Sequence, residues 1–134
     1  MIVSNRSEIT ILALDDEIDV LDQLANVLGA AGYTCRCAQN ALAAVQIMRE
    51  ATPHLIIADI NLSGKSGLAV CEKLTHEAGL EHVPVMFLSA AQVPDIIRRA
   101  HADGGTYYLR KPLDATVLLE LVIRTTATPH LTGT

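Results

Sequence analysis

The sequence has few aromatic residues and no long apolar run. Only four of its 134 residues are aromatic, three Tyr and one Phe, so we expect an aliphatic core that does not depend on large rings. No apolar run approaches the roughly 20 residues of a membrane-spanning helix. No basic segment followed by an apolar one precedes the first predicted strand. We therefore expect a cytoplasmic protein with no membrane association.

Basic residues and cysteines are also scarce. Ten Lys and Arg stand against 15 Asp and Glu, which gives a formal net charge of −5. No basic stripe is present, so direct nucleic-acid binding by this chain is not expected. Cys35 and Cys37 share a predicted strand, and Cys71 stands alone on a predicted helix. We interpret all three as small buried residues of a reducing compartment, without a disulfide or a metal.

Apolar runs that end abruptly at polar side chains are the strongest positive feature. Residues 9–14 run into Asp15 and Asp16, residues 55–58 into Asp59, residues 85–88 into Ser89, and residues 106–109 end close to Lys111. Continuous runs rich in Ile, Leu and Val are typical of strands buried on both faces of a parallel sheet. In an open parallel sheet, ligands bind at the carboxyl ends of the strands. The polar residues are therefore expected to form one site.

Helical patterns separate these runs and a weaker strand at 33–38. Helices are predicted at 18–28, 40–50, 68–78, 93–100 and 114–125, with residues 63–67 as a loop. Five strands alternating with five helices predict an α/β domain with a parallel sheet covered on both faces. Strand order does not follow from periodicity. We assign residues 1–126 to this domain and residues 127–134 to a tail or the start of a linker. Because Met1 precedes only a short lead-in, we expect the domain to be N-terminal in its natural protein.

Three carboxylates are expected to converge at the strand ends. Asp15, Asp16 and Asp59 would repel one another unless a cation compensates them or one takes up a proton. An all-oxygen site open to solvent suits Mg²⁺, which keeps several waters and binds one or two carboxylates plus phosphate oxygens. Capping of a helix would explain Asp16 taken alone, and capping of a turn would explain Asp59 taken alone. Capping does not explain all three.

Ser89 and Lys111 indicate which chemistry the site serves. A phosphoryl group on Asp59 would carry its charge on three terminal oxygens. Mg²⁺ can neutralise one, the Lys111 ammonium a second, and the Ser89 hydroxyl can donate to the third. Transfer to a carboxylate needs positioning and charge neutralisation rather than a separate acid or base.

Over residues 8–126 the chain resembles the receiver domain of two-component response regulators, of the chemotaxis-regulator type. The matching features occur in the family's order and spacing: the acidic pair Asp15-Asp16, the phosphoacceptor Asp59, the loop residue Gly67, Ser89 followed by Ala90, and Gly104 followed by residues 107–112 with Lys111-Pro112. No single feature is specific, but six in order are strong support for the resemblance.

The resemblance implies a fold, a metal and roles for individual residues. The fold is the flavodoxin-like doubly wound sandwich, with strand order 2-1-3-4-5. Asp16 and Asp59 would bind Mg²⁺ directly, Asn61 would bind it through its backbone carbonyl, and Asp15 would act mostly through water. Tyr108 would be the switch aromatic, moving inward when Ser89 moves toward the phosphoryl group. The Lys111–Pro112 peptide bond is expected to be cis.

The resemblance also implies a phosphorelay switch rather than an enzyme with an external substrate. A sensor histidine kinase or a histidine phosphotransfer protein would phosphorylate Asp59, and the domain would catalyse only its own phosphorylation and hydrolysis. Output would pass through the fourth helix, fifth strand and fifth helix. The last helix has apolar residues around most of its circumference, so Leu119, Ile123 or both should be left for a partner. That partner would be a second copy or an effector domain.

Two positions depart from the family pattern. Ser63 stands four residues after Asp59, where the family usually has Pro, and this change is expected to loosen the loop without removing a chemical group. Ala91 stands two residues after Ser89, where many relatives carry a polar side chain. With Asn61 as the polar group two positions beyond Asp59, the rate of dephosphorylation is left open.

Two alternative functions have weaker support. A haloacid-dehalogenase-type phosphatase also uses an Asp at a strand end, a Ser or Thr, a Lys and Mg²⁺. That class needs a second Asp two residues after the nucleophile, and Asn61 cannot exchange protons there. A pseudo-receiver that only docks partners would not require the intact acidic pair Asp15-Asp16 together with Asp59, Ser89 and Lys111.

Overall fold

The computed structural model describes residues 6–90 and 106–127. Its elements, in chain order, are η1 (Arg6–Glu8), β1 (Thr10–Leu14), α1 (Ile18–Ala30), β2 (Thr34–Ala38), α2 (Ala41–Glu50), β3 (Leu55–Asp59), β4 (Asn61–Leu62), β5 (Lys65–Ser66), α3 (Gly67–Ala78), β6 (Val85–Ser89), β7 (Thr106–Arg110) and α5 (Ala115–Ala127). The helix predicted at 93–100, together with Ala91 and Gly104, lies outside the described residues.

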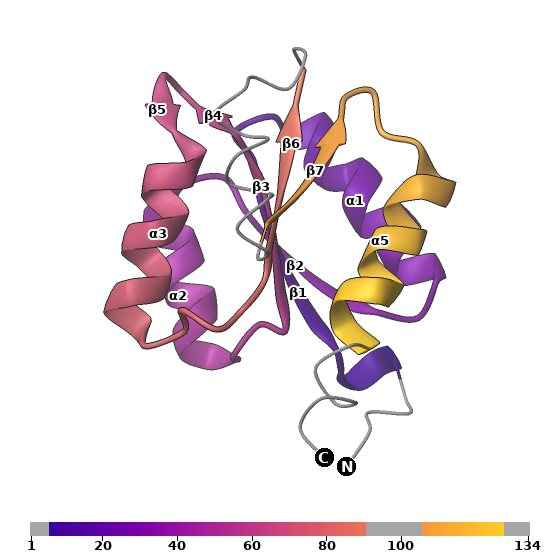
Figure 1. Ribbon diagram of the computed structural model, residues 1–134, viewed down its shortest axis with the longest axis horizontal. Coiled ribbons are helices and arrows are strands. Elements are labelled where there is room, and N and C mark those ends of the chain that lie inside the picture. Colours follow the sequence, from indigo (N-terminus) through magenta and orange to yellow (C-terminus); the bar gives the residue numbers. More distant parts are fainter. Residues whose placement is uncertain (1–5, 91–105, 128–134) are drawn as a thin grey trace.

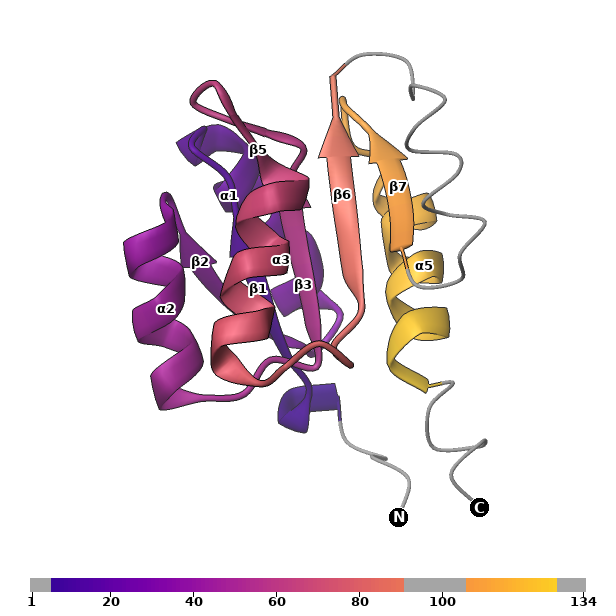
Figure 2. The ribbon, with the colours of Figure 1, turned by 60° about the vertical axis from the view of Figure 1, so that its left-hand side comes forward.

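The main sheet has five parallel strands in the order β2-β1-β3-β6-β7 (Figures 1 and 2). Numbered as five successive strands of one sheet, this is the predicted order 2-1-3-4-5. β3 is the central strand, and all five of its residues are buried. The flavodoxin-like fold expected from the sequence is confirmed.

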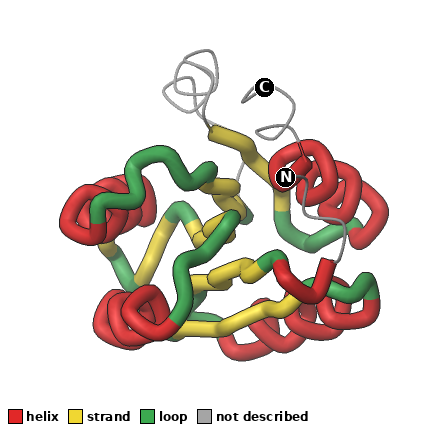
Figure 3. The backbone as a smooth tube through the Cα atoms, turned by 90° about the horizontal axis from the view of Figure 1, so that it is seen from below, coloured by secondary structure: helices red, strands yellow, loops and turns green. Residues whose placement is uncertain are grey.

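Helices cover both faces of this sheet, so that it forms the middle layer (Figure 3). α1 and α5 lie on one face, and α2 and α3 on the other (Figure 1). Successive strand residues point to opposite faces: Ile11 and Ile57 belong to the core under α1 and α5, whereas Leu12 and Ile56 belong to the core under α2 and α3. Two aliphatic cores therefore hold the strands, and the strand ends carry the polar side chains.

Short polar side chains fix where α2, α3 and α5 begin. The side chain of Asn40 accepts a hydrogen bond from Ala43 N–H, that of Ser66 from Ala69 N–H, and that of Asp114 from Thr116 and Val117 N–H. Each satisfies backbone donors that have no partner within the helix. Asn40 is thus the residue at which the helix predicted at 40–50 begins.

The segment after β3 is more ordered than the predicted loop. β4 and β5 form a two-stranded antiparallel hairpin closed by Ser63 and Gly64. Both turn residues have positive φ, 50° at Ser63 and 83° at Gly64, as a two-residue type I′ turn requires. The Ser-Gly pair is a recognised turn signal. The adjoining runs are too short to show strand periodicity.

The three cysteines are free, but only Cys71 is buried as expected, since Cys35 is half-buried and Cys37 is exposed. Burial raises the pKa of Cys35 and of Cys71 to about 12. These two thiols therefore stay protonated at neutral pH and are poor nucleophiles. Within the described segments, no helix has the length and hydropathy needed to cross a membrane.

The last helix keeps part of its apolar surface exposed. Leu118 and Val122 are fully buried under the sheet, and Leu119 packs partly against the same core. Ile123 is 42% exposed and Val117 is 40% exposed. The expectation that this helix has apolar residues left over is confirmed for Ile123. Leu119 is instead half-covered within the chain.

Candidate functional site

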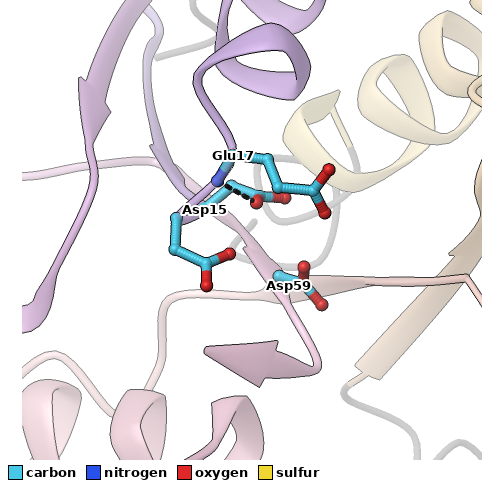
Figure 4. Close-up of side chains that lie close together, drawn as sticks. Asp15, Glu17 and Asp59 are labelled. Atoms are coloured by element: carbon cyan, nitrogen blue, oxygen red, sulfur yellow. Dashed lines mark hydrogen bonds between the residues drawn. The ribbon is translucent and has the colours of Figure 1, made fainter. Parts of the chain in front are cut away.

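The predicted site residues meet at the carboxyl ends of four strands. Asp15 follows β1, Asp59 and Ser89 are the last residues of β3 and β6, and Lys111 follows β7. Figure 4 shows Asp15, Glu17 and Asp59 close together, with Glu17 at the start of α1. Parallel pairing brings these strand ends to one edge of the sheet, although the residues lie far apart in the sequence.

Four carboxylates form the acidic part of the site. One oxygen from each of Asp15, Asp16, Glu17 and Asp59 lies within 4.8 Å of the others. Asp15 and Asp59 are buried. Glu17 was not predicted from the sequence, because an acidic residue at the start of a helix is common for its favourable interaction with the helix dipole. The position of Glu17 directly after the acidic pair Asp15-Asp16 was the sequence feature that could have indicated its place in the site.

Lys111 supplies the positive charge of the site. Its ammonium nitrogen lies 2.8 Å from Asp59 Oδ2, 3.1 Å from Asp15 Oδ2 and 3.3 Å from Glu17 Oε1. Burial of the ammonium lowers its pKa, but the carboxylates of Asp59 and Asp15 more than offset this effect, so the pKa of Lys111 lies above its ordinary value. The side chain is therefore fully charged at neutral pH.

Asp15 is the most buried carboxylate of the site. Its side chain has no exposed surface, and burial raises its pKa, opposed by the hydrogen bond from Glu17 N–H and by the nearby Lys111 ammonium. That backbone hydrogen bond to Asp15 Oδ1 is 2.9 Å long. Its other oxygen, Oδ2, has the Lys111 ion pair but accepts no hydrogen bond from the described residues.

Asp16 is held by the turn of the β4–β5 hairpin. Its Oδ2 atom accepts two hydrogen bonds from Ser63, one from the hydroxyl at 2.8 Å and one from the backbone N–H at 3.1 Å. The hydroxyl bond is the main reason that the pKa of Asp16 lies below its ordinary value. Ser63 was expected only to loosen this loop. The structure shows that it also contributes two donors to the site.

Each oxygen of Asp59 has a partner on the protein. Oδ1 accepts a hydrogen bond of 2.9 Å from Asn61 N–H, and Oδ2 accepts one of 2.8 Å from Lys111. The side chain of Asn61 in turn accepts a bond from Gly64 N–H within the hairpin. The Asp59 carboxylate is therefore fixed in orientation, with an ammonium beside it.

Of the other predicted site residues, Ser89 lies at the same edge, whereas Tyr108 is in the middle of β7 and does not line the cavity there. Ser89 is buried, and its backbone carbonyl accepts a hydrogen bond of 2.8 Å from Lys111 N–H. Tyr108 is half-buried, and its ring stacks on Phe87 with centroids 5.8 Å apart. Burial raises the pKa of the Tyr108 hydroxyl. The Lys111–Pro112 peptide bond is cis, as predicted.

An open cavity of about 340 Å³ lies between these residues. Its lining consists of Asp16, Glu17, Asp59, Ile60, Asn61, Ser63, Gly64, Ser89, Ala90 and Lys111. Larger hollows between α2 and α3 contain no such cluster of acidic and basic groups. We therefore take the strand-end cavity, rather than either of these larger hollows, as the functional site.

The donor set fits a small divalent cation. Four carboxylates face one ammonium, which leaves an excess of three formal negative charges when all are ionised. The buried Oδ2 of Asp15 has an ion pair with Lys111 but accepts no hydrogen bond from the described residues. Carboxylate oxygens at an open cavity are ligands that suit Mg²⁺, which retains waters. Asp15, Asp16 and Asp59 are therefore the residues that could hold such an ion.

Comparison with known proteins shows to which family of domains the chain is similar. A family model described as "Response regulator receiver domain" matches residues 11–123. The chain is 32% identical over 124 residues to the Phosphate regulon transcriptional regulatory protein PhoB of Pseudomonas aeruginosa, covering 92% of this chain and 53% of that protein. It is 30% identical over 108 residues to the Polar-differentiation response regulator DivK of Brucella anthropi, covering 81% of this chain and 87% of DivK.

Solved structures show the same fold. The chemotaxis protein CheY4 of Vibrio cholerae superposes with a TM-score of 0.77 at 25% identity, covering 87% of this chain and 98% of that one. Several curated relatives are longer than the matched region: the chain spans about half of PhoB and about a quarter or less of two further relatives. The similarity therefore concerns one domain that occurs both alone and within larger proteins.

Proposed function

The chain belongs to the response regulator receiver domain family, and on that basis we propose that Asp59 accepts a phosphoryl group from a phosphohistidine of a partner protein. The family makes the chain a signalling switch domain of two-component systems rather than a conventional enzyme. The observation that supports Asp59 as the acceptor is its position at the end of β3, 2.8 Å from the Lys111 ammonium and among three other carboxylates.

The residues at the site support an in-line transfer to Asp59. A carboxylate oxygen of Asp59 attacks phosphorus, the bond from phosphorus to the imidazole nitrogen breaks, and that nitrogen keeps the electron pair. Lys111 would neutralise charge on the transferred group, and the Ser89 hydroxyl would donate a hydrogen bond to it. Mg²⁺, held by Asp16, Asp59 and the Asn61 carbonyl with Asp15 acting mostly through water, would neutralise further charge on the phosphoryl oxygens.

The donor would be a sensor histidine kinase or a histidine phosphotransfer protein. Hydrolysis of the aspartyl phosphate would then return the domain to its resting state. The phosphorylated state would be read through a shift between two conformations. Ser89 and Tyr108 are the proposed switch residues.

A phosphatase of the haloacid-dehalogenase type has less support. That chemistry needs an acid or base two residues after the nucleophile, where Asn61 stands. The Asn61 side chain accepts a hydrogen bond from Gly64 N–H and so serves the turn. A pseudo-receiver is also disfavoured, because Asp15, Asp59 and Lys111 are all present and in contact.

We expect Mg²⁺ to bind weakly without a phosphoryl group. Asp16→Ala should lower the affinity of the protein for Mg²⁺ by about tenfold or more, which corresponds to a loss of about 1.4 kcal/mol or more of binding free energy. The ion keeps most of its waters in such a site, so few direct ligands hold it. Titration followed by NMR should shift resonances near Asp15, Asp16, Asp59 and Asn61. Shifts centred on the histidines instead would contradict this site.

Ile123 is the proposed contact with a second copy of the domain or with an effector domain. Replacement of Ile123 by Glu should reduce self-association of the phosphorylated protein by about tenfold, because a charge would be buried in an apolar contact. Val117→Glu is the matched control variant. Val117 is about as exposed as Ile123 but lies about 120° away from it around the axis of α5. Sedimentation with and without acetyl phosphate measures the effect. Equal association of Ile123→Glu and the wild type would contradict a contact between copies through Ile123.

A further inference from the structure

Ser63 makes an unusual pair of hydrogen bonds to the acidic site. Its hydroxyl and its backbone N–H both donate to the same oxygen, Oδ2 of Asp16, at 2.8 and 3.1 Å. The two residues are 47 positions apart in the sequence. Two donors from one residue restrict rotation of the Asp16 carboxylate more than a single donor would. The contact also joins the loop after β1 to the β4–β5 hairpin.

The backbone of Ser63 is adapted to this contact. Its φ of 50° lies in the left-handed region, which costs a non-glycine residue about 1 kcal/mol. Proline, which the family usually has at this position, fixes φ near −65° and has no N–H. A proline here could provide neither hydrogen bond and could not adopt this turn. The serine therefore changes both the shape of the hairpin and the surroundings of Asp16.

We propose that Ser63 is a positioning residue for the divalent cation: it holds the Asp16 carboxylate in place before the ion binds. This rests on the proposed function, in which Asp16 is a ligand of Mg²⁺. A partly exposed Asp loses rotational freedom when it coordinates an ion, and a carboxylate that is already oriented loses less. Residues that hydrogen-bond to metal ligands commonly change metal affinity by roughly tenfold to a hundredfold.

One effect opposes this gain. Hydrogen bonds to Oδ2 withdraw charge from the carboxylate and make it a weaker ligand. The orienting effect should dominate, because the ion interacts with several carboxylates and one hydroxyl changes the total charge little. Because Asp16 lies at the open side of the site and the ion keeps waters, we expect the lower end of the range, about threefold to tenfold.

The test is the Mg²⁺ affinity of Ser63 variants in the absence of any phosphodonor, measured by titration calorimetry or NMR. Ser63→Gly keeps the N–H and tolerates a φ of 50°, so it removes only the hydroxyl. We expect its dissociation constant for Mg²⁺ to rise about threefold. Ser63→Pro removes both donors and should raise it by about tenfold. An unchanged or tighter affinity of Ser63→Gly would overturn the proposal.

A matched control lies on the same hairpin. The Ser66 hydroxyl accepts a hydrogen bond from Ala69 N–H and contacts no carboxylate of the site. Ser66→Ala should therefore leave Mg²⁺ affinity within about twofold of the wild type after correction for any unfolded fraction. An equal loss of affinity in Ser66→Ala would show that loosening of the hairpin, rather than orientation of Asp16, is responsible, and would refute the proposal.

A second readout separates positioning from general damage. Phosphorylation of Ser63→Gly by acetyl phosphate should need about threefold more Mg²⁺ for half-saturation, with the rate at saturating Mg²⁺ within about twofold of the wild type. A fall in the saturating rate without a change in half-saturation would contradict a positioning role. If the wild-type protein bound no Mg²⁺ at all, the proposed function itself would fail. Equal binding of Mg²⁺ by the wild type and Ser63→Gly would instead refute only the positioning role of Ser63.

Discussion

Asp59→Asn is expected to abolish phosphorylation by acetyl phosphate and Mg²⁺, under conditions in which the wild-type protein gains one phosphoryl group. The amide has no negative oxygen to attack phosphorus, and no other carboxylate of the site has the same position at the end of β3. Asp59 is also the carboxylate closest to the Lys111 ammonium, at 2.8 Å. Intact-protein mass spectrometry measures the added group directly.

The loss should not come from unfolding. Replacing one of four clustered carboxylates with an amide relieves repulsion between like charges. The thermal midpoint of Asp59→Asn should therefore equal or exceed that of the wild type. Asp19→Asn, the same chemical change at an exposed residue in the first turn of α1, should be phosphorylated normally. Undiminished labelling of Asp59→Asn would show that another residue accepts the phosphoryl group.

Asp15, Asp59, Ser89 and Lys111 could be predicted from the sequence because each lies at or close to the end of an apolar run. Asp59 follows a run of residues that are all buried in β3, and Ser89 follows a similar run in β6. Burial on both faces leaves a local pattern that can be read without knowing the strand order. The strand order itself came from the resemblance to the receiver family. The connections between parallel strands do not change the periodicity of the sequence, so periodicity cannot indicate which strands are neighbours.

Other contacts at the site could not be predicted in this way. In the sequence, Glu17 has the features of an ordinary acidic residue at the start of a helix. Only the folded chain brings its Oε1 atom to 3.3 Å from Lys111 Nζ. In the sequence, Ser63 has the features of a turn residue that replaces a proline. Its hydrogen bonds to Asp16 join segments that are distant in the sequence. Both contacts depend on tertiary geometry. Neither leaves a pattern in the neighbouring residues.

Gly67 shows how closely the backbone approaches the site, and its replacement should have the largest effect on stability. It is the first residue of α3, it is buried, and its N–H donates a hydrogen bond of 2.7 Å to Ile60 O. A Cβ atom at this position would lie 1.9 Å from the carbonyl oxygen of Asp59 and 3.0 Å from Ile60 Cα. These neighbours are backbone atoms, so no side-chain rotation can relieve the overlap.

Gly67→Ala should therefore destabilise the protein by about 3 kcal/mol, the upper end of the usual cost of overpacking. Any relaxation that makes room for the methyl group must move the backbone of Asp59, so phosphorylation of the folded fraction should also slow. Urea denaturation measures the free energy of unfolding, and labelling by acetyl phosphate measures the second effect.

Gly29 provides the matched control for this substitution. It lies in the last turn of α1, and a Cβ atom there would meet nothing within 4 Å. Gly29→Ala should stabilise the protein by about 0.5 to 1 kcal/mol, because alanine loses less backbone entropy in a helix. The two variants make the same chemical change with opposite expected signs. If Gly67→Ala were as stable as the wild type, α3 would have to lie farther from the end of β3 than this structure places it.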